Sequence, residues 1–227
     1  MIFESMQTAV QPIMKKIKQL DFITQLIDGN LAMAKFIFYI KQDLLYLNDY
    51  ARALALTGVR ATENQHLQQF LQFALGAIDA ETALHNDYLK RYQTNNTDKK
   101  LSMSPSCFMY NNYLMRTAAI TSVEESMSAL LPCFWIYHEI GKHIASANTN
   151  PDNPYQQWID LYSGSDFILP TQQMIDIVNT IAQTASTQLH KKMITAFLTA
   201  SRLEWQFWHS AYHEETWQID LPILPSQ

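Results

Sequence analysis

A carboxylate stands inside an apolar stretch near residue 43. Asp43, Tyr46 and Tyr50 fall at positions i, i+3 and i+7, so on a helix the three side chains share one face. A carboxylate on an apolar face costs free energy unless it is paired or hydrogen-bonded. Asp43 is therefore either a helix-edge residue that meets solvent or a buried carboxylate that hydrogen-bonds a polar ligand.

A second carboxylate lies in an aromatic stripe near the C-terminus. Glu204, Phe207, Trp208 and Tyr212 fall at i, i+3, i+4 and i+8. Aromatic stripes with this spacing usually form core. A lone carboxylate in such a stripe is desolvated, which raises its pKa into the range that suits acid–base chemistry.

The candidate nucleophile is Cys133. Cys133 and Tyr137 fall at i and i+4 and share a helical face, and Pro132 is expected to kink the same helix because it removes a backbone hydrogen bond. Most lone helical cysteines are inert packing residues. From this segment alone, Cys133 is either such a residue or a reactive thiol.

Possible metal ligands are few. Glu81 and His85 share a helical face at i and i+4, a spacing that fits either two ligands or an ordinary polar pair. His138 and His143 resemble a zincin motif only superficially, because their spacing is five residues instead of four and the imidazoles diverge around the helix.

Apolar residues recur at helical spacing over most of the chain. The spacing predicts helices over residues 3–18, 31–57, 62–92, 105–120, 122–146, 166–184 and 187–215, with shorter pieces near 21–28 and 154–162. The breaks between them are short and polar or contain proline. We therefore expect one all-α domain over residues 1–217 and a non-helical tail over 218–227.

The composition narrows the class of protein. The chain has 227 residues, a net charge of -5 and only 5 glycines, which disfavours turn-rich sheet folds and Gly-rich phosphate loops. The mild acidity disfavours nucleic-acid binding, and the longest apolar run, 129–137, is far shorter than the roughly 20 residues that span a membrane.

The N-terminus lacks a signal-peptide pattern, so we expect a cytoplasmic protein in which Cys107 and Cys133 are free thiols. Charged residues make up 16% against roughly 25% in typical proteins, which suggests a surface covered by another subunit.

In order along the chain, these segments resemble the TenA/thiaminase II family. The matching stretches are 22–29 (FITQLIDG), 36–47 (FIFYIKQDLLYL), 81–85 (ETALH), 104–110, 131–141 (LPCFWIYHEIG), 155–167 (YQQWIDLYSGSDF) and 204–217 (EWQFWHSAYHEETW). The most specific elements are Gln-Asp-x-x-Tyr-Leu, Pro-Cys-x-Trp-x-Tyr and Glu-x-x-Phe-Trp. The resemblance implies a haem-oxygenase-like helical bundle without metal or cofactor, assembled as a homotetramer.

The activity that the resemblance implies is hydrolysis at the methylene carbon of an aminopyrimidine. The substrate is thiamine or 4-amino-5-aminomethyl-2-methylpyrimidine, and the product, 4-amino-5-hydroxymethyl-2-methylpyrimidine, re-enters thiamine synthesis. Cys133 matches the Cys class of the family and adds to the pyrimidine ring, which breaks aromaticity and divides one hard step into easier ones. The resemblance likewise implies that Glu204 moves protons and that Asp43 binds the amino group and the ring nitrogen. The implied pocket-lining residues are Tyr46, Tyr110, Tyr137 and Tyr162.

Departures from the family pattern lie beside two of these residues. Asn111 and Asn112 follow Tyr110, and Leu44 and Leu45 make the segment after Asp43 more apolar. We expect them to affect the preferred substrate more than the reaction.

Two alternatives remain open. A haem-oxygenase-like di-iron oxidase could begin its ligand set with Glu81, His85 and Glu139, although the absence of histidine between His143 and His190 removes the usual second cluster. A haem oxygenase is disfavoured because no histidine precedes residue 66. A non-catalytic member that only binds thiamine or a pyrimidine is disfavoured because the aspartate, cysteine and glutamate of the site are all present.

Overall fold

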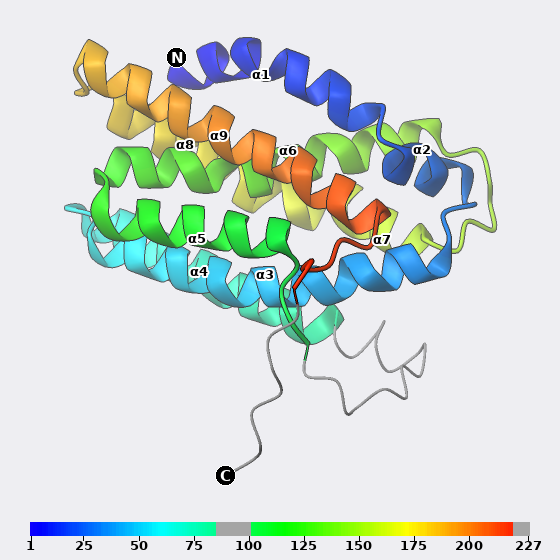
Figure 1. Cartoon of the computed structure of the whole chain (residues 1–227). Helices are drawn as coiled ribbons and strands as arrows, with labels where there is room; N and C mark the ends of the chain where they lie inside the picture. Colours follow the sequence, from blue (N-terminus) through cyan, green and yellow to red (C-terminus); the bar gives the residue numbers. More distant parts are fainter. Residues whose placement is uncertain (85–100, 220–227) are drawn as a thin grey trace.

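The computed structural model describes residues 1–84 and 101–219, and all regular structure in these residues is helical (Figure 1). The helices are α1 (Ile2–Lys18), α2 (Asp21–Asp28), α3 (Met33–Val59), α4 (Asn64–Leu84), α5 (Pro105–Ile120), α6 (Val123–Ala147), α7 (Gln156–Ser163), α8 (Ser165–Ala182) and α9 (Thr187–Tyr212). The prediction of an all-α fold is confirmed. Residues 85–92 of the predicted helix 62–92 and residues 220–227 of the predicted tail lie outside the described residues.

Local sequence explains most of the helix boundaries. Ser104, Ser122 and Ser186 begin α5, α6 and α9, and each side-chain oxygen accepts a hydrogen bond from a backbone N–H of the first turn. The predicted helix 187–215 ends earlier, at Tyr212, because Glu214 adopts a left-handed φ of 49° and the N–H of Glu215 turns back to the carbonyl of Ser210. The chain after α9 is thereby free to run in a new direction.

The helices pack around α3 and α6, which carry most of the candidate site residues. Helix α6 packs against α9, α7 and α8, and α3 packs against α4 and α5. Figure 1 shows α1 lying along the outer side of α8 and α9, and α3, α4 and α5 together on the opposite side of the bundle. Two glycines allow close approaches: a Cβ on Gly58 would lie 2.8 Å from Phe70 of α4, and one on Gly141 would lie 2.6 Å from the backbone of Tyr162 in α7.

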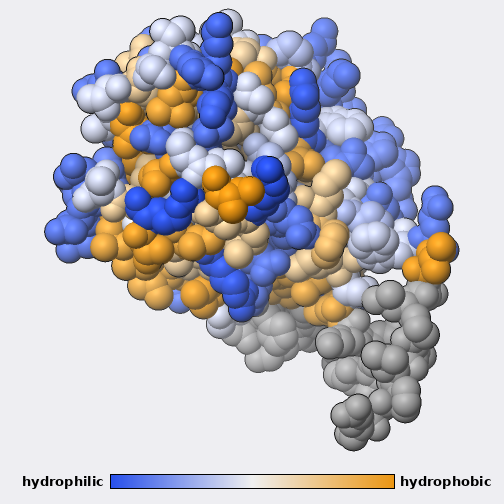
Figure 2. All heavy atoms as spheres, turned by 60° about the vertical axis from the view of Figure 1, so that its left-hand side comes forward, coloured by the Kyte–Doolittle hydropathy of each residue, from blue (hydrophilic) through white to orange (hydrophobic). Residues whose placement is uncertain are grey.

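The surface of the bundle retains apolar side chains. Val59 and Ile120, at the ends of α3 and α5, are exposed, as are Leu71, Leu75 and Ile78 along α4. Figure 2 shows hydrophobic atoms spread over the face at one end of the bundle, between hydrophilic patches. Within residues 1–84 and 101–219, no helix combines the length and the hydropathy that a membrane span requires.

Candidate functional site

A cavity of about 290 Å³ lies between α3, α4, α6, α7 and the start of α8. Its wall is largely apolar and aromatic, and among the side chains that the structure describes Asp43 is the one acidic or basic residue in it. The lining residues are Asp43, Leu47, Tyr50, Gln72, Phe73, Gly76, Ala77, Ala80, Cys133, Phe134, Tyr137, Leu161, Tyr162, Phe167 and Pro170. A carboxyl and a thiol in an aromatic enclosure suit a flat, polar-edged ligand.

Asp43 is a buried carboxyl with an unused acceptor. Its side chain is 2% exposed, and its Oδ2 atom has no hydrogen-bond partner in the described part of the chain. Burial raises the pKa of Asp43 from 3.8 to about 7. The helix-edge alternative for Asp43 is therefore wrong: the residue faces the cavity, where a ligand with donor groups can satisfy the carboxyl.

Cys133 lies in α6 beside the cavity. It is partly accessible through the cavity, whereas Cys107, the other free cysteine, is fully buried. Burial within the fold and, next, the negative charge of Glu204 raise the pKa of the Cys133 thiol well above its ordinary range. Helix α6 continues through Pro132 from Val123 to Ala147. Cys133 is thus a protonated thiol within reach of small molecules and electrostatically coupled to a carboxyl.

Glu204 lies in α9 behind the cavity wall. It is 1% exposed, and its Oε1 atom accepts a hydrogen bond of 2.7 Å from the Tyr110 hydroxyl. Burial raises the pKa of Glu204 from 4.5 to about 8; the Tyr110 hydrogen bond opposes this rise and the charge of Asp43 adds to it. A carboxyl with a pKa near neutrality both gives and takes protons readily.

Aromatic side chains connect the two carboxyls and the thiol. The Tyr46 ring lies 5.0 Å from the Tyr110 ring and 5.3 Å from the Tyr50 ring, and the Tyr46 hydroxyl is buried without a hydrogen-bond partner among the described residues. On the other side of the cavity, the rings of Tyr137 and Tyr162 lie 4.9 Å apart. These contacts join α3 to α5 and α6 to α7 around the candidate site.

Further hydrogen bonds fix the orientation of Tyr137. The hydroxyl of Tyr39 donates to that of Tyr137 at 3.3 Å and accepts from Nε1 of Trp158 at 3.3 Å. The ring of Tyr137 also packs at 4.8 Å from that of Trp208 in α9. Tyr137 is therefore held from α3, α7 and α9 while it lines the cavity.

Comparison with known proteins places this geometry in one family. The model of the TENA/THI-4/PQQC family matches residues 7–214. The chain belongs to the TENA/THI-4/PQQC family. An aminopyrimidine aminohydrolase of Halalkalibacterium halodurans is 33% identical over 95% of this chain and 97% of its own length.

Solved structures agree with this membership. A TenA homologue from P. horikoshii OT3 superposes with a TM-score of 0.84 at 26% identity, over 94% of this chain and 99% of that one. A domain with a haem-oxygenase-like fold from Shewanella denitrificans superposes with a TM-score of 0.73 at 13% identity, over 93% and 92% of the two chains. The haem-oxygenase-like bundle predicted from the sequence is confirmed.

The seven expected site residues fall into two groups. Asp43, Cys133, Tyr137 and Tyr162 line the cavity. The three others form the layer behind that wall: Tyr46, Tyr110 and Glu204. The two groups meet because Tyr46 and Asp43 are neighbours on one face of α3 and because the charge of Glu204 acts on Cys133.

Several lining residues were not expected from the sequence. Tyr50 comes from α3, as Asp43 does, and Phe134 directly follows Cys133 in α6. Gln72 and Phe73 reach the cavity from α4, and Phe167 reaches it from α8. Tyr50 has a sequence signal, since it follows Asp43 at i+7 on the same helical face. The sequence of helix α4 has no comparable signal, because its pattern does not show which face packs toward Cys133.

The departures from the family pattern do not touch the cavity. Asn111 is buried, and its Nδ2 donates to the carbonyl of Leu45 and to Oδ2 of Asp49, both at 3.2 Å. Asn112 is exposed, and Leu44 is buried in the core. The cavity wall contains none of these residues, nor Leu45. They therefore make no direct contact through which they could change the preferred substrate.

The di-iron alternative finds little support. Glu139 pairs with Lys142 at 3.1 Å, while His85 and the side chain of Glu81 lie outside the described part of the structure. Among residues 1–84 and 101–219, no group of three or more His, Cys, Asp or Glu is placed to hold a metal ion.

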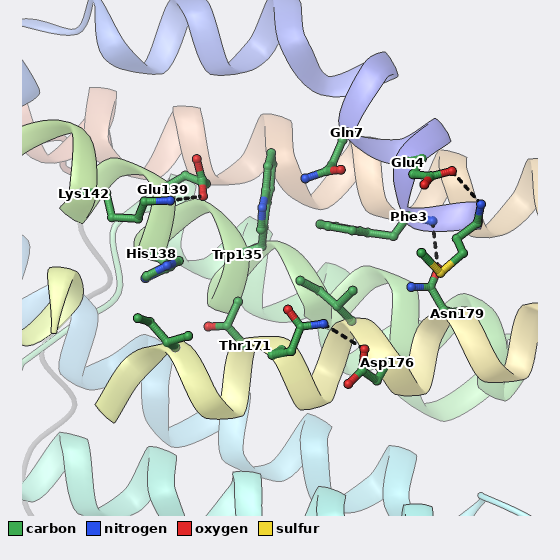
Figure 3. A pocket seen from close by; sticks show the side chains of 14 residues that line it. Phe3, Glu4, Gln7, Trp135, His138, Glu139, Lys142, Thr171, Asp176 and Asn179 are labelled. Atoms are coloured by element: carbon green, nitrogen blue, oxygen red, sulfur yellow. Dashed lines mark hydrogen bonds and ion pairs between the residues drawn. The ribbon is translucent and has the colours of Figure 1, made fainter. Parts of the chain in front are cut away.

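A second hollow, of about 430 Å³, lies between α1, α6 and α8. Figure 3 shows Glu139 and Lys142 paired at its edge and leaving α6 on this side. This second hollow has a larger volume than the cavity beside Cys133, but Asp43, Cys133 and Glu204 are absent from its lining. Of the two hollows, the cavity beside Cys133 is therefore the candidate active site.

Proposed function

We propose that the chain is an aminopyrimidine aminohydrolase of the thiaminase II type that hydrolyses an aminopyrimidine at its methylene carbon, in thiamine salvage or degradation. The observation that carries the proposal is the unpartnered Asp43 carboxyl beside Cys133 in an aromatic cavity. Relatives that bear the name aminopyrimidine aminohydrolase, at 29 to 33% identity over 81 to 95% of this chain, support the substrate class.

Asp43 recognises the edge of the pyrimidine. A 4-aminopyrimidine presents an N–H donor and a ring nitrogen side by side, and one carboxyl group matches both. With a pKa of about 7, Asp43 can donate its proton to the ring nitrogen while its other oxygen accepts from the amino group. Tyr137 and Tyr162 hold the ring by its faces.

Cys133 and Glu204 carry the covalent steps. The sulfur of Cys133 bonds to a ring carbon as its proton passes to the Glu204 carboxylate, and the electron pair that enters the ring expels the amine or thiazole from the methylene carbon. Glu204 returns the proton to the departing amine. When the leaving group is the neutral thiazole, which takes no proton, Glu204 releases this proton to solvent instead. Water then adds to the methylene carbon and gives a proton to Glu204. Cleavage of the C–S bond restores the aromatic ring, and Glu204 returns that proton to the Cys133 thiolate.

The proton balance sets the working pH. Glu204 must be ionised to accept the thiol proton, and with a pKa of about 8 only about a tenth of it is ionised at pH 7. Asp43, with a pKa of about 7, must keep its proton for the ring nitrogen, so we expect kcat to rise from pH 5 to a maximum between about 7 and 8 and to fall above it. A pH–rate profile between pH 5 and 9 checks this; a rate that falls from pH 5 to the expected maximum would contradict the assigned role of Glu204.

We also propose a cytoplasmic homotetramer whose only ligand is the small aminopyrimidine, with no nucleic acid or membrane partner. The exposed apolar residues on α4 and at the ends of α3 and α5, together with the low charged fraction, suit burial between subunits. Light scattering after size exclusion tests the assembly: a mass near four times 26.2 kDa supports it, and a monomer overturns it.

The activity is tested on two substrates with one preparation. Purified protein in the presence of a metal chelator is supplied with 4-amino-5-aminomethyl-2-methylpyrimidine or with thiamine, and hydroxymethylpyrimidine is measured by chromatography. Formation of this product from either substrate supports the proposal, and the ratio of kcat/KM values identifies the preferred one. No product from either substrate would overturn it.

A further inference from the structure

The segment after α9, residues 213–219, crosses the beginning of α5. Figure 1 shows it leaving the end of α9 and running toward the chain that enters α5. The backbone N–H of Ser106 donates to Oε2 of Glu215 at 2.9 Å, and Nε1 of Trp217 donates to the carbonyl of Met103 at 2.8 Å. The Trp217 ring also packs at 5.8 Å from that of Phe108. Three contacts in 213–219 therefore converge on residues 103–108.

Gln42 holds the same entry to α5 from the other side. Its Nε2 donates to the carbonyl of Ser102 at 3.1 Å, and its Oε1 accepts from the N–H of Ser104 at 2.8 Å. Gln42 is 6% exposed and directly precedes Asp43 in α3. A buried amide with both of its ends bonded to backbone fixes the position of that backbone closely.

The entry to α5 determines where Tyr110 lies. Helix α5 begins at Pro105 with a Ser104 cap, and Tyr110 follows within two turns of this fixed end. The Tyr110 hydroxyl reaches Glu204 at 2.7 Å, a short contact that a shift of the helix by one ångström would break.

We propose that Glu215, Trp217 and Gln42 are positioning residues that clamp the start of α5 and so keep the Tyr110 hydroxyl on the Glu204 carboxyl. None of the three lines the cavity, so they act through Tyr110 and not on the substrate. The proposal deepens the proposed function and rests on it for its catalytic consequence. Its structural part, the link from the clamp to Glu204, holds independently of the substrate.

The consequence is electrostatic. The Tyr110 hydrogen bond stabilises the ionised form and holds the pKa of Glu204 below the value that burial alone would produce. Release of the clamp therefore raises the pKa of Glu204. The other titratable groups that act together with Glu204 are Asp43, Tyr39, Tyr46 and Tyr50 on α3, Tyr110 on α5, and Cys133 and Tyr137 on α6. The clamp and control substitutions below change none of them; Tyr110→Phe serves only as the reference in which the bond to Glu204 is removed.

The first test follows the titration of Glu204 in the full-length protein without substrate. Protein labelled with ¹³C at the glutamate side-chain carboxyl is titrated by NMR, and Glu204→Gln assigns the signal. Trp217→Ala and Glu215→Ala should each raise the pKa of Glu204 by about half a unit or more, toward the value in Tyr110→Phe. The matched controls Ile219→Ala and Gln218→Ala, exposed neighbours on the same segment, should leave it unchanged.

A double substitution separates positioning from plain stability. In the Tyr110→Phe background, Trp217→Ala should add no further pKa shift, because the bond through which the clamp acts is already gone. The clamp would be overturned if Trp217→Ala raised the pKa of Glu204 by the same amount with and without the Tyr110 hydroxyl. It would also be overturned if Glu204 kept its wild-type pKa in both Trp217→Ala and Glu215→Ala, whatever the melting temperatures of these variants.

Turnover supplies the second readout. Trp217→Ala should lower kcat on aminomethylpyrimidine at pH 7 about threefold or more with KM little changed, and should move the rising limb of the pH–rate profile to higher pH. If the wild-type protein turns over neither substrate, the proposed function fails while the NMR titration still decides the clamp.

Discussion

At the scale of the residue, the site is built from groups that resist ionisation. Asp43 and Glu204 are both deeply buried, with pKa values raised to about 7 and about 8, and burial also raises the pKa of the Cys133 thiol. A buried charge without a partner is costly, so at pH 7 Glu204 and Cys133 largely keep their protons and Asp43 is about half protonated. In the mechanism that we propose, the aminopyrimidine edge supplies the hydrogen bonds that Asp43 lacks, and the ionised fraction of Glu204 provides the negative charge that passes through the sulfur of Cys133 into the ring.

Asp43→Asn tests recognition of the pyrimidine. The amide cannot place a proton on the ring nitrogen and also accept from the amino group with the geometry of the carboxyl. We expect the dissociation constant for hydroxymethylpyrimidine, measured by calorimetry, to rise about tenfold to a hundredfold, the 1–3 kcal/mol that a buried unsatisfied group costs. Asp79→Asn, an exposed position on α4, is the control. Wild-type affinity in Asp43→Asn would show that the ligand does not contact this carboxyl.

Sequence spacing predicted part of this site for a physical reason. The i, i+3 and i+4 positions of a helix share a face, so Asp43 could be grouped with Tyr46, and Cys133 with Tyr137. The helical period cannot tell which member of a face lines a cavity and which lies behind it. That depends on how far neighbouring helices stand apart, and so Phe73 of α4 could not be predicted.

At the scale of the element, most helix boundaries follow from local chemistry. Apolar periodicity and polar breaks predicted the helices to within a few residues wherever both helix ends are described. The end of α9 differs because Glu214 leaves the helical conformation. The turn after Tyr212 exists because residues 215–217 bond to α5 and its entry, a long-range contact that no local pattern contains.

Gly141→Ala tests the contact between α6 and α7. A Cβ at this position would stand 2.6 to 2.8 Å from the backbone and Cβ of Tyr162, so the two helices must separate. We expect a loss of about 1–3 kcal/mol in the free energy of unfolding, measured with denaturant, and a fall in turnover because Tyr162 moves away from Tyr137. Gly76→Ala is the stability control: nothing lies within 4 Å of its Cβ, and the substitution should stabilise α4 by about 0.5–1 kcal/mol. Wild-type stability in Gly141→Ala would contradict the close packing.

At the scale of the whole molecule, the two buried carboxyls of the site lower the free energy of unfolding of the bundle at neutral pH. In the unfolded chain, Asp43 and Glu204 ionise near their ordinary pKa values of 3.8 and 4.5. Above these values, ionisation lowers the free energy of the unfolded state and not that of the folded state. The folded state retains these protons up to about pH 7 and about pH 8. It therefore binds more protons than the unfolded state between these limits, and its stability falls as the pH rises.

Glu204→Gln should remove part of this pH dependence. Each retained proton contributes a slope of about 1.4 kcal/mol per pH unit, so the free energy of unfolding between pH 5 and 7 should decline less steeply in Glu204→Gln by about that amount. Denaturant unfolding at fixed protein concentration measures the slopes, with the exposed Glu63→Gln as control. Identical slopes in wild type and Glu204→Gln would show that Glu204 ionises normally in the folded protein.

The site itself is tested most directly by turnover of aminomethylpyrimidine with wild type, Cys133→Ser and Cys107→Ser side by side. Wild type and Cys107→Ser should form hydroxymethylpyrimidine at rates within about threefold of each other, because Cys107 is buried away from the cavity and serine retains its donor group. Cys133→Ser should be slower by about a thousandfold or more while it still binds the product, since the hydroxyl is a far weaker nucleophile than the thiol. Turnover by Cys133→Ser at the wild-type rate would contradict the assignment of Cys133 as the nucleophile.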